Sequence, residues 1–144
     1  MAGTFRSAHF GTLDIHPDSV LTFPAGMPGF EDLRRFTILD HPEQPALIFL
    51  QSLERPGLCF LTAPVEVLRP DYELLISEED LELLGVRDTA AGGFKALAVL
   101  SLVEGEEPTA NLLSPVVIHT ASGQAVQAIR PDQRYTCRER LACS

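Results

Sequence analysis

Short apolar runs separated by turn-forming residues recur along the whole chain. With proline or glycine between them, such runs are typical of an all-β sandwich or barrel. The runs span residues 12–16, 20–23, 36–40, 46–52, 58–63, 72–77, 94–103, 116–119 and 124–129. The pattern therefore predicts an all-β, mainly antiparallel, small β-barrel-like single domain.

The longest run, residues 94–103, is apolar on both faces. Successive side chains of a strand point to opposite sides, so alternate residues share a face. One face holds Phe94, Ala96, Ala98, Leu100 and Leu102, and the other holds Lys95, Leu97, Val99, Ser101 and Val103. We expect this strand in the middle of the sheet. Near the end of the chain, TASG predicts a short hairpin loop in which Gly123 takes a positive φ.

Two segments have helical features instead. Ser77 can cap the first amides of a helix, Asp80 completes a capping-box pattern with it, and Gly85 can end the helix in a left-handed conformation. Residues 31–36 place acidic side chains before Arg34 and Arg35, which suits the helix dipole and predicts a single helical turn. We therefore expect one or two short helices beside the strands.

The stretch TFPAGMPGFEDL holds two prolines and two glycines within six residues. Pro24 followed by Gly26 suits a type I turn, and Pro28 followed by Gly29 suits a type II turn. Two successive turns reverse a strand and return Phe30 to the core. We expect this stretch to serve the architecture, as a structural turn.

Composition limits the class of protein. At 144 residues the chain fits one domain, residues 1–144, with residues 131–144 as a polar C-terminal tail. No apolar run approaches the roughly 18 residues that span a membrane, and the first residues show no secretory signal. We therefore expect a cytoplasmic protein without a membrane contact. Of the three cysteines, Cys59 is expected to be a small buried hydrophobe, whereas the roles of Cys137 and Cys143 stay open.

The net charge of −9 argues against direct nucleic-acid binding, because an acidic surface repels phosphate. The acids fall into two clusters. The first acidic cluster is Glu66, Asp71, Glu73, Glu78, Glu79, Asp80 and Glu82, and the second is Glu104, Glu106 and Glu107. Each cluster is either a solvated loop or a docking patch for a basic protein.

Residue patterns that carry chemistry are missing. The four histidines and three cysteines show no metal-ligand spacing, and no phosphate-binding motif occurs, so we expect no metal, no cofactor and no enzyme. A thiol enzyme built on Cys59 is an alternative, but an apolar strand would raise the pKa of its thiol and disfavour the reactive thiolate.

Several segments together resemble a known family. FGTLDI, GMPGFE, LQS, PDYE and TANLLSP occur in this order along nearly the whole chain, as they do in the flagellar assembly factor FliW family. The resemblance implies a non-enzymatic regulator that binds cytoplasmic flagellin. It also implies binding to CsrA, a small RNA-binding translational repressor.

The two contacts are implied to be mutually exclusive. Free protein would antagonise CsrA allosterically and relieve repression of flagellin synthesis, whereas flagellin-bound protein would release it. A flagellin-specific chaperone without CsrA binding is the alternative. The candidate partner-binding residues, chosen for their chemistry, are Asp71, Tyr72, Glu73, Glu78 and Glu79.

Three of the quoted segments also allow simpler interpretations. Tyr72 can instead be a core aromatic, because one face of a strand must be buried. Asn111 is expected to hold a turn by bonding its own backbone. Gln51 and Ser52, which follow an apolar run, are expected to be polar loop residues.

Overall fold

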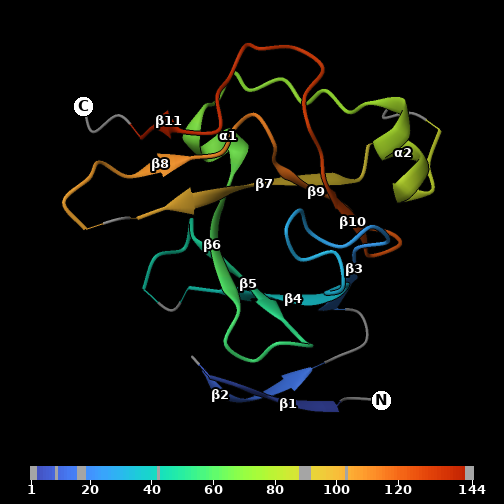
Figure 1. The fold of residues 1–144 in the computed structure, drawn as a ribbon, viewed down its shortest axis with the longest axis vertical. Helices are drawn as coiled ribbons and strands as arrows, with labels where there is room; N and C mark the ends of the chain where they lie inside the picture. The colour runs from blue at the N-terminus through green and yellow to red at the C-terminus, as the bar shows by residue number, and fades with distance from the viewer. Residues whose placement is uncertain are drawn as a thin grey trace.

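The computed structural model shows a barrel with a separate hairpin on one side (Figure 1). The hairpin pairs β1 (Gly3–Ser7) with β2 (Gly11–Ile15) as an antiparallel two-stranded sheet. The backbone N–H of Ala8 donates to the carbonyl of Pro56, 3.0 Å away, and so ties the hairpin to the barrel. The structure describes residues 3–8, 10–15, 19–41, 43–87, 92–102 and 104–141.

Seven strands close the barrel because β7 pairs with β6 on one side and with β9 on the other. All pairings are antiparallel except that between β3 and β10, where Gln124 lies opposite Thr22. The barrel strands are β3 (Val20–Thr22), β4 (Arg35–Asp40), β5 (Ile48–Ser52), β6 (Cys59–Pro64), β7 (Phe94–Ser101), β9 (Val116–His119) and β10 (Gln124–Gln127). The predicted all-β, mainly antiparallel barrel is confirmed as a closed mixed barrel.

Two short strands extend the sheet beyond the barrel. β8 (Thr109–Ala110) pairs with the end of β7, and β11 (Glu139–Arg140) pairs with β8. In Figure 1 this extension lies beside α1. The C-terminal part of the chain therefore packs on the outside of the barrel wall.

The predicted helix at residues 77–85 is confirmed as α2 (Glu78–Leu84). The backbone N–H of Asp80 donates to Ser77 Oγ, 3.2 Å away, and Gly85 ends the helix with φ of 77°. A second short helix, α1 (Val65–Leu68), follows β6 directly. Among the described residues, no helix is long and apolar enough to cross a lipid bilayer.

Two local expectations are wrong. The helical turn at residues 31–36 is absent: residues 31–32 form a turn and β4 begins at Arg35, because strand pairing buries Phe36 completely. The strand at residues 72–77 is also absent. Its apolar side chains pack on the barrel wall without a partner strand, so the same alternation serves an irregular segment.

Strand β7 separates two apolar cores, as its two apolar faces predict. Leu97 and Val99 pack in the barrel interior, whereas Ala96 and Ala98 face the outer layer that holds α1 and the C-terminal residues. A third cluster lies between α2 and the barrel wall. The hairpin between β9 and β10 is also confirmed, with Gly123 at φ of 73°.

The stretch from Pro24 to Phe30 forms two hydrogen-bonded turns. The N–H of Gly26 donates to the carbonyl of Phe23 at 2.9 Å, and the N–H of Phe30 donates to that of Met27 at 2.7 Å. Gly26 and Gly29, the latter directly after Pro28, have φ of 70° and 86°. The turns bury Phe23 and Met27 in the barrel core, and the partly buried Phe30 packs against that core.

Candidate functional site

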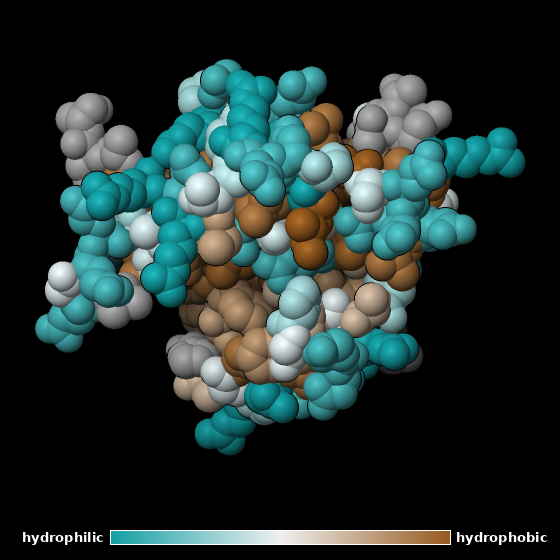
Figure 2. All heavy atoms as spheres, turned by 45° about the horizontal axis from the view of Figure 1, so that its top comes forward, coloured by the Kyte–Doolittle hydropathy of each residue, from teal (hydrophilic) through white to brown (hydrophobic). Residues whose placement is uncertain are grey.

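The candidate partner-binding residues lie on the segment between α1 and α2 and on the first turn of α2. We call residues 69–79 the acidic segment; up to residue 77 it has no regular secondary structure. The side chains of Asp71 and Glu73 are 75% and 70% exposed. Glu78 and Glu79 are exposed on the first turn of α2. Figure 2, which brings the top of Figure 1 forward, shows hydrophilic residues over much of this side.

Tyr72 points inward between the two exposed carboxylates. Its hydroxyl donates to the carbonyl of Leu112 at 2.8 Å, and its ring stacks on that of Tyr135 with the centroids 4.7 Å apart. The side chain is half-buried and packs on the outer apolar core. The structure therefore brings Asp71 and Glu73 to the surface while Tyr72 fastens the segment to the barrel.

A buried arginine, Arg130, lies beneath the acidic segment. Its Nε and Nη2 donate to the two carboxylate oxygens of Asp132 at 2.8 and 2.9 Å. Its Nη1 donates to the backbone carbonyl of Glu73. Its guanidinium carbon lies 4.9 and 5.0 Å from the ring centroids of Tyr72 and Tyr135. We call these five groups the Arg130 clamp.

The groups of the clamp shift one another's titration. Hydrogen bonds with Asp132 raise the pKa of Arg130, and the same bonds lower the pKa of Asp132 below its ordinary value of 3.8. Burial raises the pKa of Tyr72 above 10.0, although the adjacent Arg130 cation opposes that shift. The clamp is thus an ion pair with a neutral tyrosine beside it throughout the neutral pH range.

Sequence reasoning did not identify Arg130 or Tyr135. Tyr135 is a large apolar ring within an otherwise polar sequence, which is a signal that it packs on something. Arg130 gives no such signal, because its charge and position match those of any surface arginine. Only the folded chain shows that its side chain has no exposed area.

Arginines of the C-terminal segment, residues 130–141, reach both acidic clusters. Arg134 lies 3.7 Å from a carboxylate oxygen of Asp71 and 3.6 Å from one of Glu73. Arg140 lies 3.5 Å from Glu107 at the second cluster. These exposed pairs contribute little stability, but they show that each cluster accepts an arginine.

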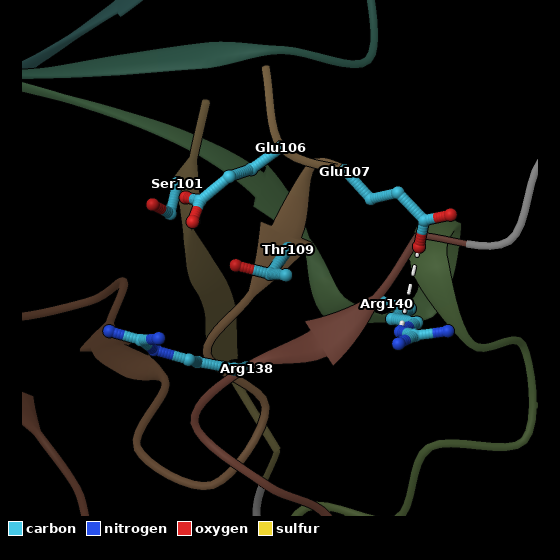
Figure 3. A pocket seen from close by; sticks show the side chains of 6 residues that line it. All are labelled: Ser101, Glu106, Glu107, Thr109, Arg138 and Arg140. Atoms are coloured by element: carbon cyan, nitrogen blue, oxygen red, sulfur yellow. Dashed lines mark ion pairs between the residues drawn. The ribbon is translucent and has the colours of Figure 1, made fainter. Parts of the chain in front are cut away.

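Surface pockets accompany both clusters. Figure 3 shows the pocket at the second cluster, about 320 Å³ in volume, with Glu107 reaching toward Arg140 and Glu106 turned toward Ser101. Another pocket, about 400 Å³, lies along α2 and is lined by Glu78, Glu79 and Glu82 among others. Both are open, charged depressions. In the described parts of the chain, no group of three or more His, Cys, Asp or Glu side chains is placed to hold a metal ion.

Cys59 is half-buried and not a core residue, contrary to expectation. Alternation along β6 turns Phe60 toward the barrel core, which leaves Cys59 on the outer face. It lines an apolar pocket of about 330 Å³ with Phe10, Phe49 and Leu61. Burial raises the pKa of the Cys59 thiol to about 11, as the sequence predicts. Cys137 is exposed, and Cys143 lies outside the described residues.

Fold and surface together define a small closed-barrel protein with an acidic face held by a buried arginine. A family model described as the FliW protein matches residues 4–141, so the chain belongs to the FliW family. This confirms the resemblance found in the sequence. The family is non-enzymatic, and the protein is therefore not an enzyme.

Similar proteins match over most of their length. The flagellar assembly factor FliW of Moorella thermoacetica is 33% identical over 137 residues, which cover 94% of this chain and 85% of that protein. That of Heliobacterium modesticaldum is 32% identical over 137 residues and is covered to 88%. A crystal structure of the flagellar assembly factor FliW aligns with a TM-score of 0.86 at 28% identity and covers 97% of each chain.

Proposed function

We propose that this protein is a flagellar assembly factor that works in the cytoplasm as a switch between two protein partners. It binds flagellin, and when free of flagellin it binds CsrA and antagonises that repressor allosterically. The observation that carries the proposal is the family match over residues 4–141, together with relatives named flagellar assembly factors. The protein thereby couples flagellin synthesis to flagellin export.

The charge of the molecule supports a basic partner. The chain has twenty acidic residues and eleven basic ones. An RNA-binding protein such as CsrA presents basic side chains. Complementary charge mainly raises the rate and specificity of association. An acidic surface is at the same time a poor RNA ligand, so the protein acts on the repressor and not on the message.

The proposed contact with CsrA lies on the acidic segment. The carboxylates of Asp71 and Glu73 are exposed and already accept an arginine of the chain itself, at 3.7 and 3.6 Å. Glu78 and Glu79 extend the same charge onto α2. In this arrangement the four carboxylates meet the partner, and Tyr72 holds the irregular part of the segment, which carries Asp71 and Glu73.

Isothermal titration with CsrA from the same organism tests the switch. The protein is titrated first alone and then after saturation with flagellin. Binding that disappears in the second titration supports the switch. Flagellin binding without any CsrA binding would instead make the protein a flagellin-specific chaperone, and binding to neither partner would refute both functions.

Glu73→Lys tests the proposed surface. The change reverses one exposed charge and should weaken CsrA binding by about three- to tenfold, since coupling across an interface charge pair is of order 1 kcal/mol. Glu43→Lys, an exposed site in the turn after β4, gives the same change in net charge as a control. Equal affinities of the two variants would remove the acidic segment from the interface.

A further inference from the structure

The charge on Arg130 is fully shielded, although the residue lies near the end of the chain. Its side chain has no exposed area, and burying a guanidinium is costly unless its donors are paired. Here Nε, Nη1 and Nη2 each have an acceptor, and two aromatic rings lie within 5.0 Å. An isolated surface arginine needs none of these contacts, so the arrangement calls for an explanation.

Those contacts join parts of the chain that are far apart in sequence. Asp132 is close to Arg130, but the Glu73 carbonyl is 57 residues away. The backbone N–H of Arg130 donates to the Leu113 carbonyl at 3.0 Å, which fixes the arginine to the segment before β9. Arg130 therefore links the barrel wall, the C-terminal segment and the acidic segment at one point.

The acidic segment depends on such links because residues 69–77 form no helix or strand. Among the residues that the structure describes, three side-chain hydrogen bonds join it to segments distant in sequence. Arg69 donates to the carbonyl of Arg140 at 2.8 Å, Tyr72 donates to that of Leu112, and Arg130 donates to the carbonyl of Glu73. Two of the three join it to the C-terminal segment. The backbone that carries Asp71 and Glu73 is thus set largely by the last residues of the described chain.

We propose that Arg130 is the positioning residue of the acidic surface and that the C-terminal segment, through this arginine, sets the affinity for the basic partner. Arg130 does not contact the partner, since its side chain is shielded. It fixes the position of the Glu73 carbonyl by a hydrogen bond. This bond also sets the direction in which the carboxylates of Asp71 and Glu73 point into solvent. The identity of the partner rests on the proposed function; the positioning of the segment does not.

Asp132 offers a route to test Arg130 without removing the buried cation. Its side chain is 40% exposed. Asp132→Asn therefore removes the negative charge from the exposed edge of the clamp, while the side chain keeps its size and shape. Asp132→Glu keeps the carboxylate and is the matched control. Both variants are made in the full chain and compared at a temperature at which far-ultraviolet circular dichroism shows them folded.

Two readouts report on the clamp and on the segment it positions, and neither needs a binding partner. The chain has two tyrosines and no tryptophan, and both tyrosines, Tyr72 and Tyr135, belong to the clamp, so the near-ultraviolet tyrosine band monitors it. Amide hydrogen exchange of residues 70–77 monitors the segment it positions. Asp132→Asn should weaken the band and speed exchange of this segment, and Asp132→Glu should restore both. An unchanged band and unchanged exchange in Asp132→Asn would overturn the positioning role.

The partner arm uses CsrA as the probe. Asp132→Asn should lower its affinity about three- to tenfold, as expected for indirect coupling, with recovery in Asp132→Glu. Faster exchange combined with unchanged CsrA affinity would overturn the link to binding and leave Arg130 purely structural. If wild-type protein does not bind CsrA, the proposed function fails, while the band and the exchange rates still decide whether Arg130 positions the segment.

Discussion

Adding a single methyl group at Gly26 should destabilise the protein far more than adding it at Gly29. Both glycines have positive φ, so alanine at either costs about 1–2 kcal/mol of backbone strain. The surroundings differ. A Cβ at Gly26 would lie 2.5 Å from the backbone oxygen and 2.6 Å from the Cα of Glu31, whereas a Cβ at Gly29 would have no atom within 4 Å.

The overlap at Gly26 is with backbone, which has little freedom to move away. Relieving it means shifting the turn that buries Phe23 and Met27, and overpacking of this kind costs about 1–3 kcal/mol. Gly26→Ala should therefore lose about 2–5 kcal/mol in the free energy of unfolding and Gly29→Ala about 1–2. Stiffening of the unfolded chain is common to both variants and cancels in the comparison.

Thermal unfolding followed by circular dichroism measures the difference. For a domain of this size 1 kcal/mol moves Tm by roughly 3–4 °C, so the extra loss of about 1–3 kcal/mol should make Gly26→Ala melt about 3–12 °C below Gly29→Ala. Equal melting temperatures, or a lower one for Gly29→Ala, would refute the argument that the close approach to Glu31 requires glycine.

Three further outcomes follow from the site. Arg134→Ala should tighten CsrA binding by up to about fivefold, because the change frees two carboxylates from an exposed arginine. Unchanged or lower affinity in isothermal titration would refute the idea that Arg134 competes with CsrA for these carboxylates. Acid should open the clamp: Asp132, whose pKa is lowered below 3.8, contributes stability that is present above that value and lost as pH falls through its folded pKa. As the pH is lowered, the tyrosine circular dichroism band should then persist down to about pH 4. Loss of the band at a higher pH would contradict the pairing of Asp132 with Arg130. With Cys137 and Cys143 changed to serine, Cys59 should alkylate at pH 8 about 100-fold more slowly than a thiol of pKa 9.0, since its own is raised to about 11; rapid labelling would argue for a reactive cysteine.

Signals that act over a few residues were predictable from the sequence. Ser77 and Gly85 mark the ends of α2, and Asn111 accepts from the N–H of Ser114 at 2.9 Å as the turn interpretation expects. The two faces of β7 could also be assigned, since period-two alternation needs no knowledge of the partner strands. In each case the physical cause lies within the segment itself.

Contacts between distant segments were not predictable in this way. Gln51 and Ser52 were expected in a loop, yet both are buried in β5, where Ser7 Oγ donates to Gln51 Oε1 at 2.9 Å. A buried glutamine is acceptable here because the fold supplies partners for its amide, and these become visible only after folding. The Arg130 clamp belongs to the same class, since its acceptor on Glu73 is remote in sequence.

The fold separates the rigid barrel from the surface that we propose binds a partner. The closed barrel buries its own aromatic core and offers no long free edge along its seven strands. The acidic segment lies outside that barrel, and its residues 69–77 form neither helix nor strand. A surface carried by such a segment gains affinity only if its conformation is fixed before binding, because ordering it afterwards consumes binding energy. Arg130 and the two tyrosines fix the segment from beneath. The carboxylates of Asp71 and Glu73, which pair with the exposed Arg134, thereby stay on the surface that we propose a basic partner meets.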